Sequence, residues 1–122
     1  MTNISRTILI VEDDPGAWFA LEALVASYGY TVSSAANGDD TLDVAAAGEF
    51  EGVLLDLLLP DMNGLEVLKQ LRFLHPTVPI LIISGYEQFK AQALASGAQA
   101  FLLKPLDAGR LWGLMLDWFG AP

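Results

Sequence analysis

The sequence has 122 residues, of which 53% are hydrophobic, and it contains no cysteine. This length suits a single domain, 1–122, with its own core, and the lack of cysteine excludes disulfides, thiolate metal sites and cysteine nucleophiles. The net charge is −9 and the six basic residues form no cluster, so direct nucleic-acid binding is not expected. No signal core and no membrane-length apolar stretch occurs, which favours a cytoplasmic location without membrane contact.

Strand-like and helix-like segments alternate five times along the chain. Most predicted strands are short runs of branched apolar residues, typical of strands covered on both faces; they are residues 7–11, 30–35, 53–56, 79–84 and 100–103. The predicted helices are residues 15–28, 39–47, 64–74, 88–96 and 107–119. This alternation indicates an α/β fold with a parallel sheet.

Acidic side chains directly follow two of the predicted strands. Glu12, Asp13 and Asp14 come after the first strand, and Asp56 ends the third. The carboxyl ends of parallel strands share one edge of the sheet, where clustered carboxylates repel one another unless a cation lies among them. Hard oxygen ligands suit Mg²⁺. The sequence therefore predicts a magnesium site at this edge, with Asp14 as a solvated residue at the helix start.

Two further residues belong to the same edge. Ser84 ends the fourth predicted strand, and Lys104 follows the fifth. A carboxylate can attack phosphorus to form an aspartyl phosphate, while Mg²⁺ and lysine neutralise charge on the phosphoryl oxygens. The combination predicts a site for phosphoryl transfer.

Four motifs follow one another in order, each at the end of a predicted strand. They occupy residues 8–15 (ILIVEDDP), 56–64 (DLLLPDMNG), 84–85 (SG) and 101–105 (FLLKP). In this order they resemble the receiver domains of two-component response regulators over essentially the whole chain. The resemblance implies a three-layer sandwich built on a five-stranded parallel sheet, the doubly wound, flavodoxin-like receiver fold.

The resemblance also implies a ligand set for Mg²⁺ as cofactor. It makes Asp56 the phosphoacceptor and a metal ligand, and Asp13 a direct ligand. Glu12 matches the acidic position that usually acts on the metal through water. The backbone carbonyl of Leu58 would complete the protein ligands.

The remaining motif positions imply a switch. Ser84 would bind the phosphoryl group, and Lys104 would pair with it. Phe101 matches the aromatic switch position, so phosphorylation would draw Ser84 towards the phosphoryl group and let Phe101 turn inward. The Lys104-Pro105 peptide matches one that family members usually hold cis, although the sequence alone does not fix the isomer.

The implied phosphodonor is a histidine kinase or a histidine phosphotransfer protein. The chain would act as a switching module that catalyses its own modification and not as a turnover enzyme. Its signal would pass through the face made by the fourth helix, fifth strand and fifth helix, with homodimerisation as one outcome. Whether the chain stands alone or is one domain of a longer protein stays open.

Two helices carry more apolar residues than one buried stripe requires. Trp18 and Phe19 are adjacent in the first helix, and we expect them on the kinase-facing side. In the last helix we expect Trp112, Leu116 and Phe119 on a partner surface. The alternative for both helices is scattered exposed hydrophobic residues without a partner.

Two other functions fit parts of this pattern. A flavodoxin-like electron carrier needs a phosphate-binding loop after the first strand, where this acidic loop would repel an anion. A haloacid-dehalogenase-type phosphatase also forms an aspartyl phosphate but needs a second acid two residues after the nucleophile, where Leu58 stands.

Outside the site, Asp61 is expected to be a turn residue and His75 a cap at the surface.

Overall fold

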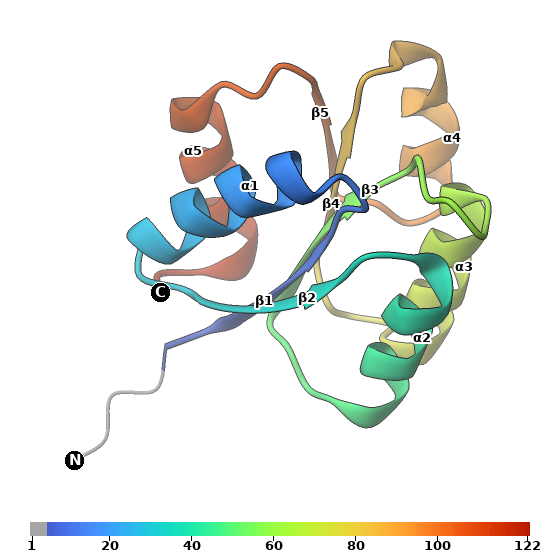
Figure 1. The fold of residues 1–122 in the computed structure, drawn as a ribbon, viewed down its shortest axis with the longest axis horizontal. Helices are drawn as coiled ribbons and strands as arrows, with labels where there is room; N and C mark the ends of the chain where they lie inside the picture. The colour runs from blue at the N-terminus through green and yellow to red at the C-terminus, as the bar shows by residue number, and fades with distance from the viewer. Residues whose placement is uncertain (1–4) are drawn as a thin grey trace.

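The computed structural model describes residues 5–122 and contains a parallel five-stranded sheet with helices on both faces (Figure 1). The strand order is β2-β1-β3-β4-β5. The strands are β1 (Thr7–Val11), β2 (Thr31–Ala35), β3 (Gly52–Asp56), β4 (Ile80–Ser84) and β5 (Ala100–Leu103). The predicted doubly wound arrangement is confirmed.

In the part of the chain that the structure describes, four α-helices and one short 3₁₀ turn connect the strands, and a fifth helix follows the last strand. They are α1 (Pro15–Ser27), α2 (Gly38–Ala47), α3 (Gly64–Leu74), η1 (Glu87–Phe89), α4 (Lys90–Ala95) and α5 (Ala108–Phe119). Within residues 5–122 no helix is long and apolar enough to cross a membrane.

Two apolar cores fill the spaces between the sheet and its two helical layers. Helices α1 and α5 cover one face, and α2, α3 and α4 cover the other (Figure 1). Successive strand residues point to opposite faces, so Leu9 enters the core under α2 and α3 while Ile8 and Ile10 enter the core under α1 and α5. Burial on both faces explains why the central strands are continuous apolar runs.

The longer helices begin at polar side chains that cap their first turns. Four residues accept a hydrogen bond from a backbone N–H two or three positions further on, namely Asp14, Asn37, Asn63 and Asp107. These bonds satisfy donors that have no partner within a helix. Asp14 is therefore the exposed helix-start residue that the sequence predicted. Gly29, with φ of 105°, closes α1 as the expected left-handed cap.

The fourth helix departs most from its prediction. Its first turn is the 3₁₀ turn Glu87–Phe89, and α4 proper covers only Lys90–Ala95. Ala93 is its single buried residue, and no side chain caps its start. Few buried apolar contacts hold α4, which is typical of an element with low local stability.

His75 caps the C-terminus of α3, as the sequence suggested, but it is half-buried and not at the surface. Its Nε2 atom lies 2.7 Å from the carbonyl oxygen of Ala45 in α2. Its ring also packs against Phe50, with 4.6 Å between the ring centroids. The residue thus ties the end of α3 to α2, at the sheet edge opposite the acids.

Candidate functional site

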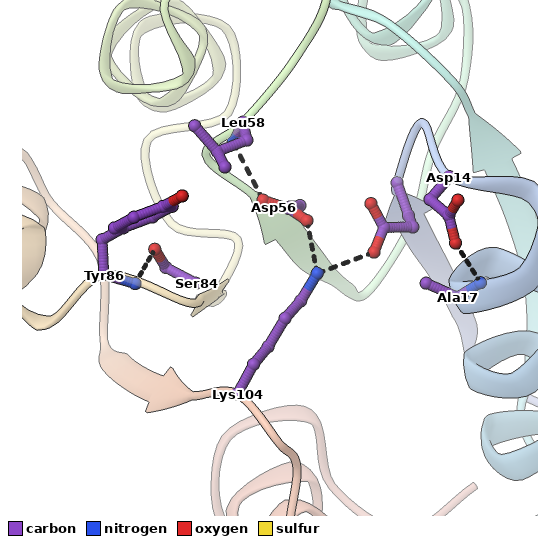
Figure 2. Close-up of polar contacts among 8 residues, drawn as sticks. Asp14, Ala17, Asp56, Leu58, Ser84, Tyr86 and Lys104 are labelled. Carbon is purple, nitrogen blue, oxygen red and sulfur yellow. Dashed lines mark hydrogen bonds and ion pairs between the residues drawn. The ribbon is translucent and has the colours of Figure 1, made fainter.

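The predicted site residues come together because four strands that lie side by side end at one edge. β1, β3, β4 and β5 are consecutive in the sheet. Glu12 follows β1, Asp56 ends β3, Ser84 ends β4 and Lys104 follows β5. The parallel topology thus places all four residues at the carboxyl edge, where ligands of such sheets bind. Figure 2 shows Asp56, Ser84 and Lys104 at this edge.

Lys104 joins the acids of two strands. Its Nζ donates to Oδ2 of Asp56 at 2.7 Å and to Oε1 of Glu12 at 2.9 Å (Figure 2). Asp56 is 5% exposed and Glu12 is 4% exposed, so both carboxylates are almost fully removed from water. Charge-assisted hydrogen bonds of this length are strong, and the single positive charge of the ammonium offsets part of the charge of the two acids.

Burial and these ion pairs shift two pKa values at the site. Desolvation is the main cause that raises the pKa of Glu12; nearby Asp56 adds to the effect and Lys104 opposes it. Burial by itself would lower the pKa of Lys104, but the hydrogen bonds from Lys104 to Asp56 and Glu12 outweigh it and raise that pKa. Lys104 is therefore a cation at neutral pH.

The acidic residues form a cluster that fits a hard cation. Carboxylate oxygens of Glu12, Asp13 and Asp56 lie within 4.8 Å of one another. Opposite ligands of an octahedral Mg²⁺ ion are about 4.2 Å apart, so a small adjustment would let all three approach one ion. The backbone N–H of Leu58 donates to Oδ1 of Asp56 at 2.8 Å, which keeps Leu58 beside the cluster. The donor set, with oxygen atoms only, fits Mg²⁺.

The two predicted switch residues are both buried. Ser84 is 0% exposed, and its Oγ accepts the backbone N–H of Tyr86 at 3.1 Å (Figure 2). That bond uses an oxygen lone pair and leaves the hydroxyl proton for another acceptor. Phe101 is 5% exposed and packs in the core beneath α3 and α4, so its ring is already inward in this conformation. The Lys104-Pro105 peptide is cis, as the motif implied.

Two exposed side chains without a carboxylate or amide group, Leu58 and Tyr86, lie at the mouth of the site. Leu58 is 51% exposed and Tyr86 is 46% exposed. Leu58 and Phe89 line a pocket of about 290 Å³ beside the loop between β3 and α3. Leu58 also occupies the place where a phosphatase of the type considered above needs its second acid, so nothing at this position favours that alternative.

The predicted partner residues of α1 lie near the site but differ in exposure. Phe19 is 68% exposed, whereas Trp18 is half-buried and packs against the core under α1 and α5. A groove of about 560 Å³ runs between α1 and the connection from β5 to α5, from Leu24 to Glu12 and Lys104. An apolar surface thus adjoins the acidic cluster.

The prediction that three residues of α5 are exposed on a partner surface is partly wrong. Phe119 is 3% exposed, because its ring packs over the β3 backbone at Gly52, where a Cβ atom would lie 2.3 Å from it. Trp112 is half-buried against Tyr28. Leu116 is 36% exposed, as expected, and Trp118 of the same helix, which was not predicted as a partner residue, is also exposed. The pattern misled because the inner stripe of α5 also includes position 119.

Asp61, expected to be an ordinary turn residue, makes specific contacts. Asp61, in the loop between β3 and α3, accepts backbone N–H groups of Gly38 and Asp39 at the start of α2. The sequence offers no periodic signal for this contact, because the two segments are more than 20 residues apart and meet only in the folded chain.

Comparison with known proteins gives one consistent family. The response regulator receiver domain family matches residues 8–115. Transcriptional regulatory protein ZraR of Klebsiella oxytoca is 38% identical over 113 residues, a match that covers 91% of this chain and 26% of ZraR. The chain therefore spans about a quarter of the length of this relative.

Solved structures share the fold over nearly the whole chain. One is the receiver domain of the sensor histidine kinase PA1611 from Pseudomonas aeruginosa, with a magnesium ion in its active-site cleft; the TM-score is 0.88 with 26% identity, covering 96% of this chain and 99% of that one. Another is a Burkholderia pseudomallei response regulator with a phosphorylated aspartic acid and a calcium ion. Its TM-score is 0.83 with 29% identity, covering 94% of this chain and 66% of the other.

Proposed function

The chain belongs to the response regulator receiver domain family of two-component systems, and we propose that Asp56 is the residue that accepts its phosphoryl group. The observation that carries this proposal is the pair of bonds that Lys104 makes to Asp56 and Glu12. They bring a buried carboxylate, a second acid and a fixed cation together at the ligand-binding edge of the sheet.

In the proposed reaction, a carboxylate oxygen of Asp56 attacks the phosphorus of a phosphohistidine on the donor protein. A P–O bond forms while the P–N bond breaks, and its electron pair returns to the imidazole nitrogen, which takes up a proton from solvent. The N–H of Leu58 holds Oδ1 of Asp56 at 2.8 Å and so fixes the orientation of the nucleophile. The products are an aspartyl phosphate and an unmodified histidine.

Lys104 and Ser84 would stabilise the transferred group. Nζ of Lys104 lies 2.7 Å from Oδ2 of Asp56, within reach of an oxygen on a phosphoryl group attached there. The hydroxyl of Ser84 keeps a proton to donate to another such oxygen, after a small movement towards Asp56. Because both residues come from strand ends, the sheet fixes where they start.

When bound, Mg²⁺ would neutralise the negative charge of the acids and of the incoming phosphoryl oxygens. We propose Asp13, Asp56 and the carbonyl of Leu58 as direct ligands, with Glu12 acting through water. Asp13→Asn should weaken Mg²⁺ binding, because an amide lacks the charge that attracts the ion. Isothermal titration of Mg²⁺ into both proteins measures the difference.

The phosphodonor, a histidine kinase or histidine phosphotransfer protein, is proposed to dock across α1. The donor histidine must reach Asp56, and the groove of about 560 Å³ beside α1 leads to that site. Helix α1 contains one charged residue, Glu22, so its outer surface suits the apolar face of a partner helix. Phe19 stands exposed on this surface.

A pair of matched variants tests this docking surface. Phe19→Ala should slow phosphotransfer from a donor protein but leave phosphorylation by acetyl phosphate unchanged. Phe73→Ala is the control, because Phe73 is 84% exposed near the end of α3, at the opposite edge of the sheet. Equal effects of the two variants on phosphotransfer would contradict docking on α1.

The proposed role is that of a switch in the cytoplasm and not of an enzyme that turns over a metabolite. The signal that phosphorylation creates would reach an output partner or a second copy through the face made by α4, β5 and α5. With a net charge of −9, this domain is not proposed to bind nucleic acid itself. In a longer protein, another segment would make any such contact.

A further inference from the structure

The N-terminus of α2 is held by a carboxylate from a distant part of the chain. Asp61 accepts the backbone N–H of Gly38 on Oδ1 at 2.7 Å and that of Asp39 on Oδ2 at 3.0 Å. The side chain of Asn37 accepts the next N–H, that of Asp40, at 2.8 Å. The first N–H groups of a helix lack partners within it, and here the three are satisfied by two residues, one of them from the β3–α3 loop.

A packing contact reinforces this polar one. Met62 follows Asp61 and lies directly against Gly38, where an added Cβ atom would come within 2.6 Å of the Met62 sulfur. Gly38 is buried, so the tip of the loop rests on the helix backbone. Two adjacent loop residues, Asp61 and Met62, therefore both contact the start of α2.

The base of the same loop is attached to the acidic cluster. The N–H of Leu58 bonds to Asp56, and Leu58 pairs with Asn63 in an isolated antiparallel bridge. Gly64 then passes so close to Leu57 that a Cβ atom there would meet its backbone at 2.2 Å. The loop is thus a short closed turn with its base at the site and its tip on α2.

We propose that Asp61 is a positioning residue of the metal site, which holds this loop so that the carbonyl of Leu58 can reach an ion bound by Asp13 and Asp56. The inference rests on the proposed function, since it takes that carbonyl as a Mg²⁺ ligand. Asp61 is not a ligand itself, because both of its oxygens bind N–H groups of α2 and it lies outside the acidic cluster.

The test is isothermal titration of Mg²⁺ into the wild-type chain, Asp61→Ala and Asp61→Asn. Loss of a residue that supports a metal ligand commonly weakens metal binding 10–100-fold, so we expect the Kd of Asp61→Ala to rise about tenfold. Asp61→Asn keeps one acceptor oxygen and should weaken binding less. Thermal unfolding without Mg²⁺ shows whether each variant is folded, and Asp61→Asn carries the test if Asp61→Ala is not.

Asp39→Asn is the matched control. It removes one negative charge from the same helix start but keeps the backbone N–H that Asp61 binds, so its Kd for Mg²⁺ should equal that of the wild type. Equal weakening in Asp39→Asn and Asp61→Asn would assign the effect to charge alone and overturn the inference. Wild-type Mg²⁺ affinity in a folded Asp61→Ala variant would overturn it and leave the proposed function intact. Failure of the wild-type chain to bind Mg²⁺ would overturn both.

Discussion

The ring of Trp112 in α5 packs against the ring of Tyr28 at the end of α1, with 4.6 Å between the ring centroids. The hydroxyl of Tyr28 donates to the carbonyl of Ala108 at 2.9 Å, and that of Tyr30 donates to the carbonyl of Gly120 at 2.6 Å. Tyr28 and Tyr30 both lie in the connection between α1 and β2, so this connection fastens α5 at both of its ends. Trp112 belongs to this attachment.

Trp112→Ala is therefore expected to destabilise the fold. A fully buried tryptophan costs about 3–5 kcal/mol when replaced by alanine, so roughly 2–3 kcal/mol is expected for this half-buried one. Urea denaturation measures the loss. Trp118→Ala is the control on the same helix, because Trp118 is 45% exposed and should change stability by about 0.5 kcal/mol or less. Similar losses in the two variants would contradict the attachment of α5.

The aspartyl phosphate is expected to be long-lived. Attacking water needs a carboxylate or amide to orient it and take its proton. Leu58 and Tyr86, the exposed residues two positions beyond Asp56 and Ser84, offer neither group. After acetyl phosphate is removed, loss of the phosphoryl group from the protein should take many minutes or longer. Leu58→Asn should shorten this time by supplying an amide. A wild-type half-life of seconds would refute the prediction.

Phosphorylation is expected to strengthen self-association through α4, β5 and α5. The exposed apolar residues of these elements include Leu94, Leu103 and Leu116. Burial of one such side chain contributes roughly 1.5–3 kcal/mol, enough to shift a weak dimer about tenfold or more. Sedimentation with and without beryllofluoride, a mimic of the phosphoryl group, measures the fraction of dimer. Leu103→Ala should reduce the increase in dimer that beryllofluoride causes. The same monomer under both conditions would contradict the dimer.

Stability should depend on Asp61 at neutral but not at low pH. Hydrogen bonds from the N–H groups of Asp39 and Gly38 hold the pKa of Asp61 below its ordinary value. A carboxylate with a lowered pKa stabilises the fold above its unfolded pKa, about 3.9, and loses this effect as the pH falls through the folded pKa. The Tm difference between wild type and Asp61→Asn should therefore shrink below about pH 4. A difference that grows on acidification would be the contrary result.

The sequence predicted the sheet and the acidic edge because both depend on local patterns. The strands of the site are apolar runs that end in a polar residue or directly before one, and parallel topology then brings Glu12, Asp56 and Lys104 together. The short α4 was not predicted, since the 88–96 segment has helix-forming residues but only Ala93 reaches the core.

The contacts that depend on tertiary packing could not be predicted in this way. Phe119 and Trp112 look like surplus apolar residues in a helical pattern, yet they are buried or half-buried against Gly52 and Tyr28. Asp61 looks like a turn residue, but it binds the start of α2. Each partner lies far away in the sequence, where neither periodicity nor turn chemistry gives a signal.

The central claim is that Asp56 accepts the phosphoryl group, and intact-protein mass spectrometry tests it most directly. After incubation with Mg²⁺ and acetyl phosphate, the wild-type chain should gain the mass of one phosphoryl group, which hydroxylamine removes. Asp56→Asn should gain none, because an amide is too weak a nucleophile to attack phosphorus. A hydroxylamine-sensitive phosphoryl group at wild-type levels on the Asp56→Asn chain would contradict the assignment.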